Sequence, residues 1–157
     1  MNIKSLSTVL IMLAALTIMA ACGMRDRQAE DFTAAERALI HGADSIMRVL
    51  TIDAPSDLAV LRSLSYDLSD SALLSDDFKR LAELMVATVT HPSQDGVGIA
   101  GPQVSLNRRI VAVQRFDKED EPFEVYPNVR IVWASDSLAA GPEGCLSVPD
   151  RRGDVLR

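Results

Sequence analysis

A single cysteine inside a glycine-rich segment is the residue of this sequence best suited to chemistry. Cys145 follows Gly144 within residues 141–149, which read GPEGCLSVP. A deprotonated cysteine is a strong ligand for a divalent metal ion. A lone cysteine is more often a small buried apolar residue. Taken alone, the segment leaves both roles open.

Closely spaced glycines mark a second segment, residues 96–103, which read GVGIAGPQ. Glycine lets a backbone come close to another backbone or to a ligand. The segment is not a dinucleotide-binding fingerprint, because it follows a predicted helix and precedes a predicted strand. By itself it indicates only a glycine loop.

Together the two segments resemble two signature motifs of the peptide deformylase family. Residues 96–103 are similar to the first motif, G-apolar-G-apolar-A-A-x-Q, and residues 143–147 (EGCLS) match the second, E-G-C-apolar-S, throughout. Residues 57–62 (DLAVLR) resemble the early D-x-x-L-R turn of the family, with one extra residue. The resemblance covers residues 46–157. One departure is Gly101, which stands where the family usually has alanine and is expected to loosen the loop.

The resemblance implies hydrolysis of the N-formyl group of formyl-methionyl peptides by a metal-bound water. The divalent metal is usually ferrous iron, with Zn²⁺ or Ni²⁺ as alternatives, and Cys145 would be its thiolate ligand. Gln103 and the backbone N–H of Leu146 would donate hydrogen bonds to the developing oxyanion.

The resemblance also implies a peptide-binding edge. Val97 and Gly98 would pair with the extended backbone of a formyl-methionyl peptide, as an added strand does. Glu143 and Gly144, which precede the predicted metal ligand, would contact the same substrate.

The third family motif, H-E-x-x-H on a helix, has no counterpart in this sequence. That motif supplies two histidine ligands and a glutamate that moves the proton. The sequence has two histidines. We interpret His41 as a surface residue and His91 as a helix-terminal residue. We therefore expect a deformylase-like fold without its C-terminal metal-binding helix. We also expect this truncated chain alone to be inactive, marginally folded and unable to retain its metal.

Residues 1–21 have the pattern of an export signal. Lys4 precedes a short apolar run at residues 9–21, and a membrane-spanning helix needs roughly 20 apolar residues. The last three residues of the run and the following Cys22 read Met-Ala-Ala-Cys. This resembles the lipobox of bacterial lipoproteins, where the cysteine is lipidated. An uncleaved anchor, a plain signal peptide and a wrongly chosen start codon are the alternatives. The lipoprotein hypothesis places the protein in the cell envelope, attached through Cys22 to a bacterial membrane and facing the periplasm or the exterior.

The elements that must position these residues form an α+β pattern. Residues 22–45 are predicted to be a tether with a short helix after Thr33, and residues 46–157 a partial deformylase domain. A longer helix is predicted between the cap Ser75 and His91. Strands are predicted at 46–52, 109–114, 123–126 and 129–133, and a turn at 54–57. The mixture predicts antiparallel sheets around a helix.

Charge and export narrow the function classes further. The chain has 16 basic and 22 acidic residues, a net charge of −6, and no basic cluster, which argues against nucleic acid as a partner. Formylated nascent chains are made in the cytoplasm, so an exported relative raises a second hypothesis. In it the chain is a non-catalytic peptide-binding lipoprotein or the product of a decayed gene fragment.

Overall fold

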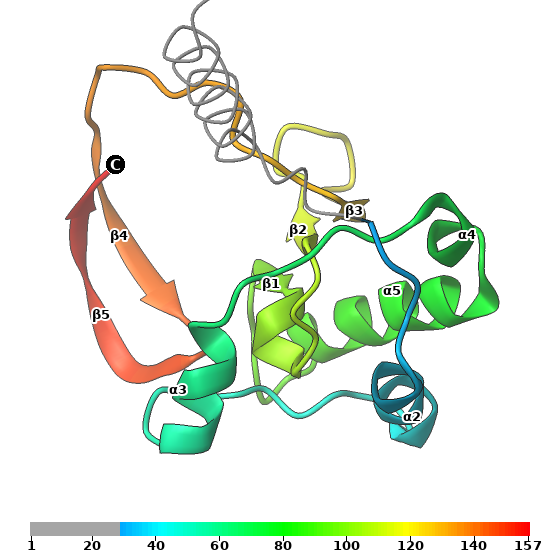
Figure 1. Ribbon diagram of the computed structural model, residues 1–157. Coiled ribbons are helices and arrows are strands. Elements are labelled where there is room, and N and C mark those ends of the chain that lie inside the picture. The colour runs from blue at the N-terminus through cyan, green and yellow to red at the C-terminus, as the bar shows by residue number, and fades with distance from the viewer. Residues whose placement is uncertain (1–28) are drawn as a thin grey trace, which may run out of the picture.

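The computed structural model describes residues 29–157 (Figure 1). The predicted export signal and Cys22 lie outside the described residues. Within residues 29–157, every helix is too short or too polar to cross a lipid bilayer.

A three-stranded antiparallel sheet packed on one helix forms the centre of the fold. The sheet has the order β1 (Gly98–Ala100), β2 (Ile110–Gln114), β3 (Phe123–Pro127). In its register Ile99 lies opposite Ala112, which lies opposite Val125. The long helix α5 (Asp76–Val89) contacts all three strands (Figure 1). The predicted α+β class and the strands near residues 109–114 and 123–126 are confirmed.

Local sequence signals explain where α5 begins and which face it buries. The Ser75 side chain accepts a hydrogen bond from the Phe78 N–H, and two aspartates in the first turn suit the positive end of the helix dipole. The helix buries a stripe of residues at helical spacing: Leu81, Leu84, Met85, Thr88 and Val89. This stripe forms one side of the core beneath the sheet.

Residues 30–42 pack against the same core. Helix α2 (Ala34–Gly42) begins with the capping box expected at Thr33 and Glu36. Phe32 and Ile40 are buried in the core cluster. The buried Arg108 guanidinium donates to both carboxylate oxygens of Glu36, at 2.7 and 2.9 Å. This segment is therefore fastened to the residues that precede β2.

The predicted strand at residues 46–52 is wrong. Its backbone donors go to three different elements instead of to one neighbouring strand. The Met47 N–H donates to the Thr88 hydroxyl, the Leu50 N–H to the Gln103 carbonyl and the Ile52 N–H to the Ser147 carbonyl. An apolar, β-branched composition predicts an extended segment, but it does not supply a partner strand.

The predicted turn at residues 54–57 is the start of a helix. Helix α3 (Pro55–Leu61) has Ala54 as its N-cap and Pro55 in its first turn, where the missing N–H and the fixed φ of proline fit well. A further short helix, α4 (Asp70–Leu73), follows.

A two-stranded hairpin of β4 (Ala140–Cys145) and β5 (Val148–Leu156) projects to one side (Figure 1). The strand predicted at residues 129–133 is wrong, since this stretch has no regular structure. Asn128 has a φ of 54°, and its side chain bonds both the N–H and the carbonyl of Leu68. These contacts turn the chain out of the sheet before the apolar residues that follow.

Candidate active site

Gln103 lies on a short 3-10 helix, η1 (Gly101–Val104), directly after β1. Its Oε1 accepts a hydrogen bond from the Ala100 N–H at 2.9 Å. Its Nε2 donates to the Ser147 hydroxyl at 3.1 Å and lies 4.0 Å from the Cys145 sulfur. Both ends of the amide are therefore held, and the N–H₂ group points toward the cysteine segment. The two predicted motifs, 42 residues apart in sequence, meet at this point.

Gly101 has a packing reason to be glycine here. A Cβ at this position would lie 2.7 Å from the Arg108 carbonyl oxygen and 2.8 Å from the Leu106 carbonyl oxygen. Both neighbours are backbone atoms, which cannot move aside cheaply. The Leu106 N–H in turn donates to the Gly101 carbonyl at 3.0 Å and closes the loop. The expectation that glycine loosens this loop finds no support in these contacts, which hold η1 against the residues before β2.

Cys145 is the last residue of β4, and Leu146 and Ser147 form the turn that leads to β5. The pairing shifts register between Gly144 and Cys145, and the cysteine is exposed with a free thiol. A Cβ on Gly96 would lie 3.0 Å from a Leu146 methyl carbon, so the absence of a side chain at Gly96 makes room for the leucine. Ser147 is buried and its carbonyl accepts the Ile52 N–H at 2.9 Å. The turn is thus docked on the centre of the fold by one apolar and several polar contacts.

The predicted peptide-binding residues divide into two sets. Val97 is exposed, and Gly98 begins β1, which lies at the edge of its sheet, with β2 on one side only in the described part of the chain. Because the Val97 carbonyl accepts the Gln114 N–H, this edge is anchored in the sheet. Glu143 instead contacts the Arg157 guanidinium across the hairpin, and Gly144 lies beside the Arg152 side chain. The structure brings Val97 and Gly98 to a free edge, while Glu143 has a partner of its own.

The residues around Cys145 do not fit a complete metal site. Among residues 29–157 no three side chains of His, Cys, Asp or Glu are grouped as metal ligands. His41 hydrogen-bonds Asp77 between α2 and α5, and His91 hydrogen-bonds Ser93. A protein site for a catalytic divalent metal has three ligands and an open position. Cys145 alone is one ligand, so we derive no chemical step through a metal from these residues.

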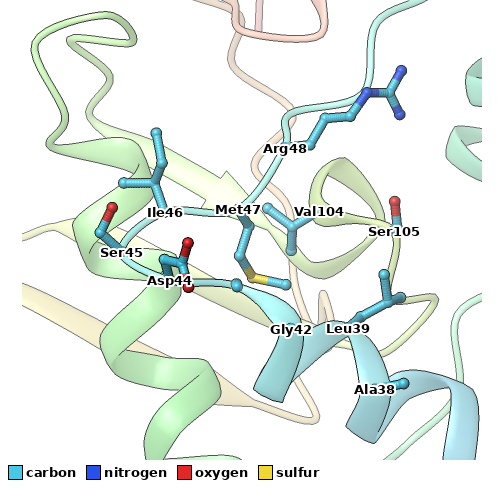
Figure 2. Close-up of a pocket in the computed structure, with 11 residues that line it drawn as sticks. Ala38, Leu39, Gly42, Asp44, Ser45, Ile46, Met47, Arg48, Val104 and Ser105 are labelled. Carbon is cyan, nitrogen blue, oxygen red and sulfur yellow. The ribbon is translucent and has the colours of Figure 1, made fainter.

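A surface pocket lies away from this site. It has a volume of about 550 Å³ and is lined by α2, the segment after α2, and Val104 and Ser105 (Figure 2). Figure 2 shows the Met47 side chain extending toward α2, and Arg48 turned away from the other labelled residues. Gln103, Cys145 and Ser147 do not line it. The candidate site is therefore an open surface beside β1 and the hairpin turn, not this pocket.

Two contributions to the site were missed in the sequence. Ser147 lies inside the second motif, but no role was assigned to its hydroxyl, which receives the Gln103 amide. Leu50 and Ile52 contribute only backbone N–H groups to the two site loops. A serine in a motif could have been noticed, whereas backbone donors carry no signal in residue type.

Comparison with known proteins agrees with this geometry. The family model described as "Polypeptide deformylase" matches residues 46–157. A peptide deformylase of Leptospira biflexa is 34% identical over 120 residues, covering 72% of this chain and 64% of the relative. Peptide deformylase 2 of Gloeobacter violaceus is 40% identical over 100 residues, covering 62% of this chain and 50% of the relative. The chain thus spans less than two thirds of the length of these curated relatives.

Solved structures show the same fold. A class I type b peptide deformylase from Acinetobacter baumannii superposes with a TM-score of 0.62 at 34% identity, covering 73% of this chain and 71% of that one. A peptide deformylase from Synechococcus elongatus, solved in complex with actinonin, has a TM-score of 0.60 at 25% identity, covering 85% of this chain and 64% of that one. With a family model matched over residues 46–157, both signature motifs in place and this fold, the chain belongs to the peptide deformylase family.

Proposed function

We propose that this chain forms the formyl-peptide recognition surface of a peptide deformylase site. In this proposal the surface serves the hydrolysis of the N-formyl group from formyl-methionyl peptides. The family implies a divalent metal, for which ferrous iron is our proposal, and Cys145 would supply one of its ligands. Two further protein ligands and a proton-transferring group are needed for turnover, and the described residues do not bring them to Cys145. We therefore expect the 157-residue chain alone to bind peptide without hydrolysing it.

The single observation that carries the proposal is the meeting of Gln103 with the hairpin turn. An oxyanion donor must be held before the reaction, so that it costs no reorganisation when charge develops. The Ala100 N–H and the Ser147 hydroxyl hold the two ends of the Gln103 amide. The amide can then donate to a formyl oxygen placed beside Cys145, and the Leu146 N–H is the second proposed donor.

The edge of β1 is the proposed seat of the peptide backbone. Strand addition uses main-chain hydrogen bonds at a free sheet edge. Val97 and Gly98 lie at such an edge, a few residues before Gln103 in the chain. A structure of the Acinetobacter baumannii enzyme with Met-Ala-Ser bound, 33% identical to this chain with a TM-score of 0.60, supports a methionyl peptide as the ligand class.

A calorimetric titration of the purified full chain with formyl-Met-Ala-Ser tests the proposal. We expect binding that Gln103→Leu weakens roughly three- to tenfold, because one hydrogen bond to the ligand contributes about 1 kcal/mol. Gln94→Leu is the matched control, since Gln94 lies in the turn after α5 and should leave the affinity unchanged. Equal affinities for the two variants, or no binding by the natural chain, would contradict peptide recognition.

Turnover is measured separately, with ferrous iron added under anaerobic conditions. We expect neither stoichiometric iron nor release of formate from the chain alone. Robust release of formate would show that the described residues suffice after all. A non-catalytic peptide-binding protein is the second candidate function. It is favoured by the exposed Cys145 thiol, which within residues 29–157 is not grouped with two further metal-ligating side chains. Peptide binding that is unchanged by Cys145→Ala would support this candidate.

We also propose that the chain is a lipoprotein anchored through Cys22 to a bacterial membrane, on the strength of the lipobox-like sequence at residues 19–22. Incorporation of labelled palmitate in cells should be lost in Cys22→Ala and retained in Cys145→Ala. Labelling that persists in Cys22→Ala would disprove this assignment.

A further inference from the structure

A short segment before α3 connects the two loops of the candidate site. The Leu50 N–H donates to the Gln103 carbonyl at 2.8 Å, and the Ile52 N–H donates to the Ser147 carbonyl at 2.9 Å. Gln103 and Ser147 come from different parts of the fold, η1 and the hairpin turn. Residues 50–52 are therefore a backbone bridge between them, which we call the bridge.

The middle residue of the bridge is held by a buried carboxylate. Asp57, in the first turn of α3, is only 5% exposed. Its Oδ2 accepts the Thr51 N–H at 3.2 Å and the Arg48 Nη2 at 2.6 Å. Arg48 precedes the bridge and its side chain is 68% exposed. A buried carboxylate must keep its hydrogen-bond donors, so this contact constrains the local backbone strongly.

We infer that Asp57 is a positioning residue for the deformylase site, acting through the bridge. Fixing the Thr51 N–H on Asp57 leaves the Leu50 and Ile52 N–H groups on either side directed at their two carbonyls. These bonds set the distance between η1 and the hairpin turn, and with it the contact between the Gln103 amide and the Ser147 hydroxyl. The inference rests on the proposed function, because it gives the bridge a role only if Gln103 meets a ligand.

Two isosteric variants separate positioning from general stability. Asp57→Asn neutralises the carboxylate on the bridge. Asp77→Asn neutralises an aspartate that is likewise ion-paired, with Arg37 and His41, but lies between α2 and α5. Amide hydrogen exchange of Leu50 and Ile52 should rise about fivefold in Asp57→Asn, because an amide oxygen accepts a hydrogen bond less strongly than a carboxylate. It should not change in Asp77→Asn.

Two readouts at the site exclude a merely structural role. The Gln103 side-chain amide resonances should shift in Asp57→Asn alone, and the affinity for formyl-Met-Ala-Ser should fall about threefold in the same variant. If Asp57→Asn does not fold, Thr51→Pro removes the same hydrogen bond from the other side and is judged by the same measurements.

The outcomes distinguish this inference from the proposed function. If the natural chain binds no peptide, exchange at the bridge and the Gln103 resonances still decide whether Asp57 positions Gln103. If peptide binds but Asp57→Asn and Asp77→Asn give the same exchange rates and resonances, Asp57 is not a positioning residue and peptide recognition stands.

Discussion

Residues 30–127, which we call the body, and the hairpin of residues 140–156 are stabilised in different ways. Every buried apolar side chain of the described chain lies in the body, between Phe32 and Ala112. The hairpin is held by its own strand pairing, and its apolar residues Val155 and Leu156 are 47% and 66% exposed. Its turn packs on the body through Leu146 and Ser147, and Cys145 at the end of β4 lies beside Gln103.

The comparison teaches where the site is vulnerable. Gln103 belongs to the body, while Cys145 and Ser147 belong to the hairpin, so the site lies where the two regions meet. The body has a core to hold its half in place. The other half depends on a few hydrogen bonds and on Leu146. Stability of the body and order of the site are therefore expected to respond to different substitutions.

Truncating a core leucine should have the largest effect. Leu81 is fully buried beneath the sheet, and Leu156 is exposed on β5. Leu81→Ala should lower the free energy of unfolding by roughly 2–5 kcal/mol. Leu156→Ala should change it by less than about 0.5 kcal/mol. Chemical denaturation followed by circular dichroism measures both. Equal losses would show that the hairpin is part of the same core.

Removing Arg108, the buried cation of the body, should have the second-largest effect on the free energy of unfolding. Arg108 is 3% exposed and bonds Glu36, and Glu36 raises the pKa of Arg108. Arg108→Met should cost about 3 kcal/mol, because the partly buried Glu36 carboxylate loses its partner and the carbonyls of Asp31 and Asp67 lose a donor. Arg37→Met, which breaks an exposed pair with Asp77, should have a much smaller effect. A similar loss in both variants would mean that residues 30–42 are held by something other than Arg108.

Adding one methyl group to each region gives a sharper test. Gly101→Ala places a Cβ against two backbone carbonyls of the body and should cost about 1–3 kcal/mol. Gly153→Ala places a Cβ on β5 with nothing within 4 Å, and it should be neutral to within about 0.5 kcal/mol. Both are read from denaturant midpoints. A neutral Gly101→Ala would show that η1 can move away from the residues before β2.

Acidification should have the smallest effect, a slight fall in the free energy of unfolding of the body. Burial raises the pKa of Glu36, but hydrogen bonds from Arg108 and Thr33 outweigh burial and bring it below its usual value of 4.5. Because its pKa is lower in the folded state, Glu36 contributes its full stabilisation above pH 4.5. This stabilisation is lost as the pH falls through the pKa of Glu36 in the folded protein. Denaturation at a series of pH values should show this loss. Glu36→Gln should reduce the slope of the free energy of unfolding against pH. An unchanged slope would assign the acid sensitivity to other carboxylates.

Much of the body could be predicted from local sequence. Ser75 with two following aspartates predicts the start of α5, and the Thr33 and Glu36 pair predicts α2, because caps are bonds between residues three apart. The two signature motifs predicted that Cys145 and Gln103 meet. The strands at 46–52 and 129–133 were wrong, because strand formation requires a partner that composition does not name.

The sequence by itself determined the family and the α+β class, and it predicted Gln103 and Cys145 as residues of the site, since these depend on residue types and short spacings. Only the tertiary structure decided that Ser147 holds the Gln103 amide, that backbone carbonyls crowd position 101 and that residues 50–52 join the two site loops. The contact between Gln103 and Ser147 and the bonds of residues 50–52 join groups that are 40 or more residues apart. The constraint at Gly101 comes from the path of the loop that follows it, up to Arg108. Backbone N–H and carbonyl groups are the same in nearly every residue, so their long-range pairing is fixed by packing and leaves no trace in residue identity.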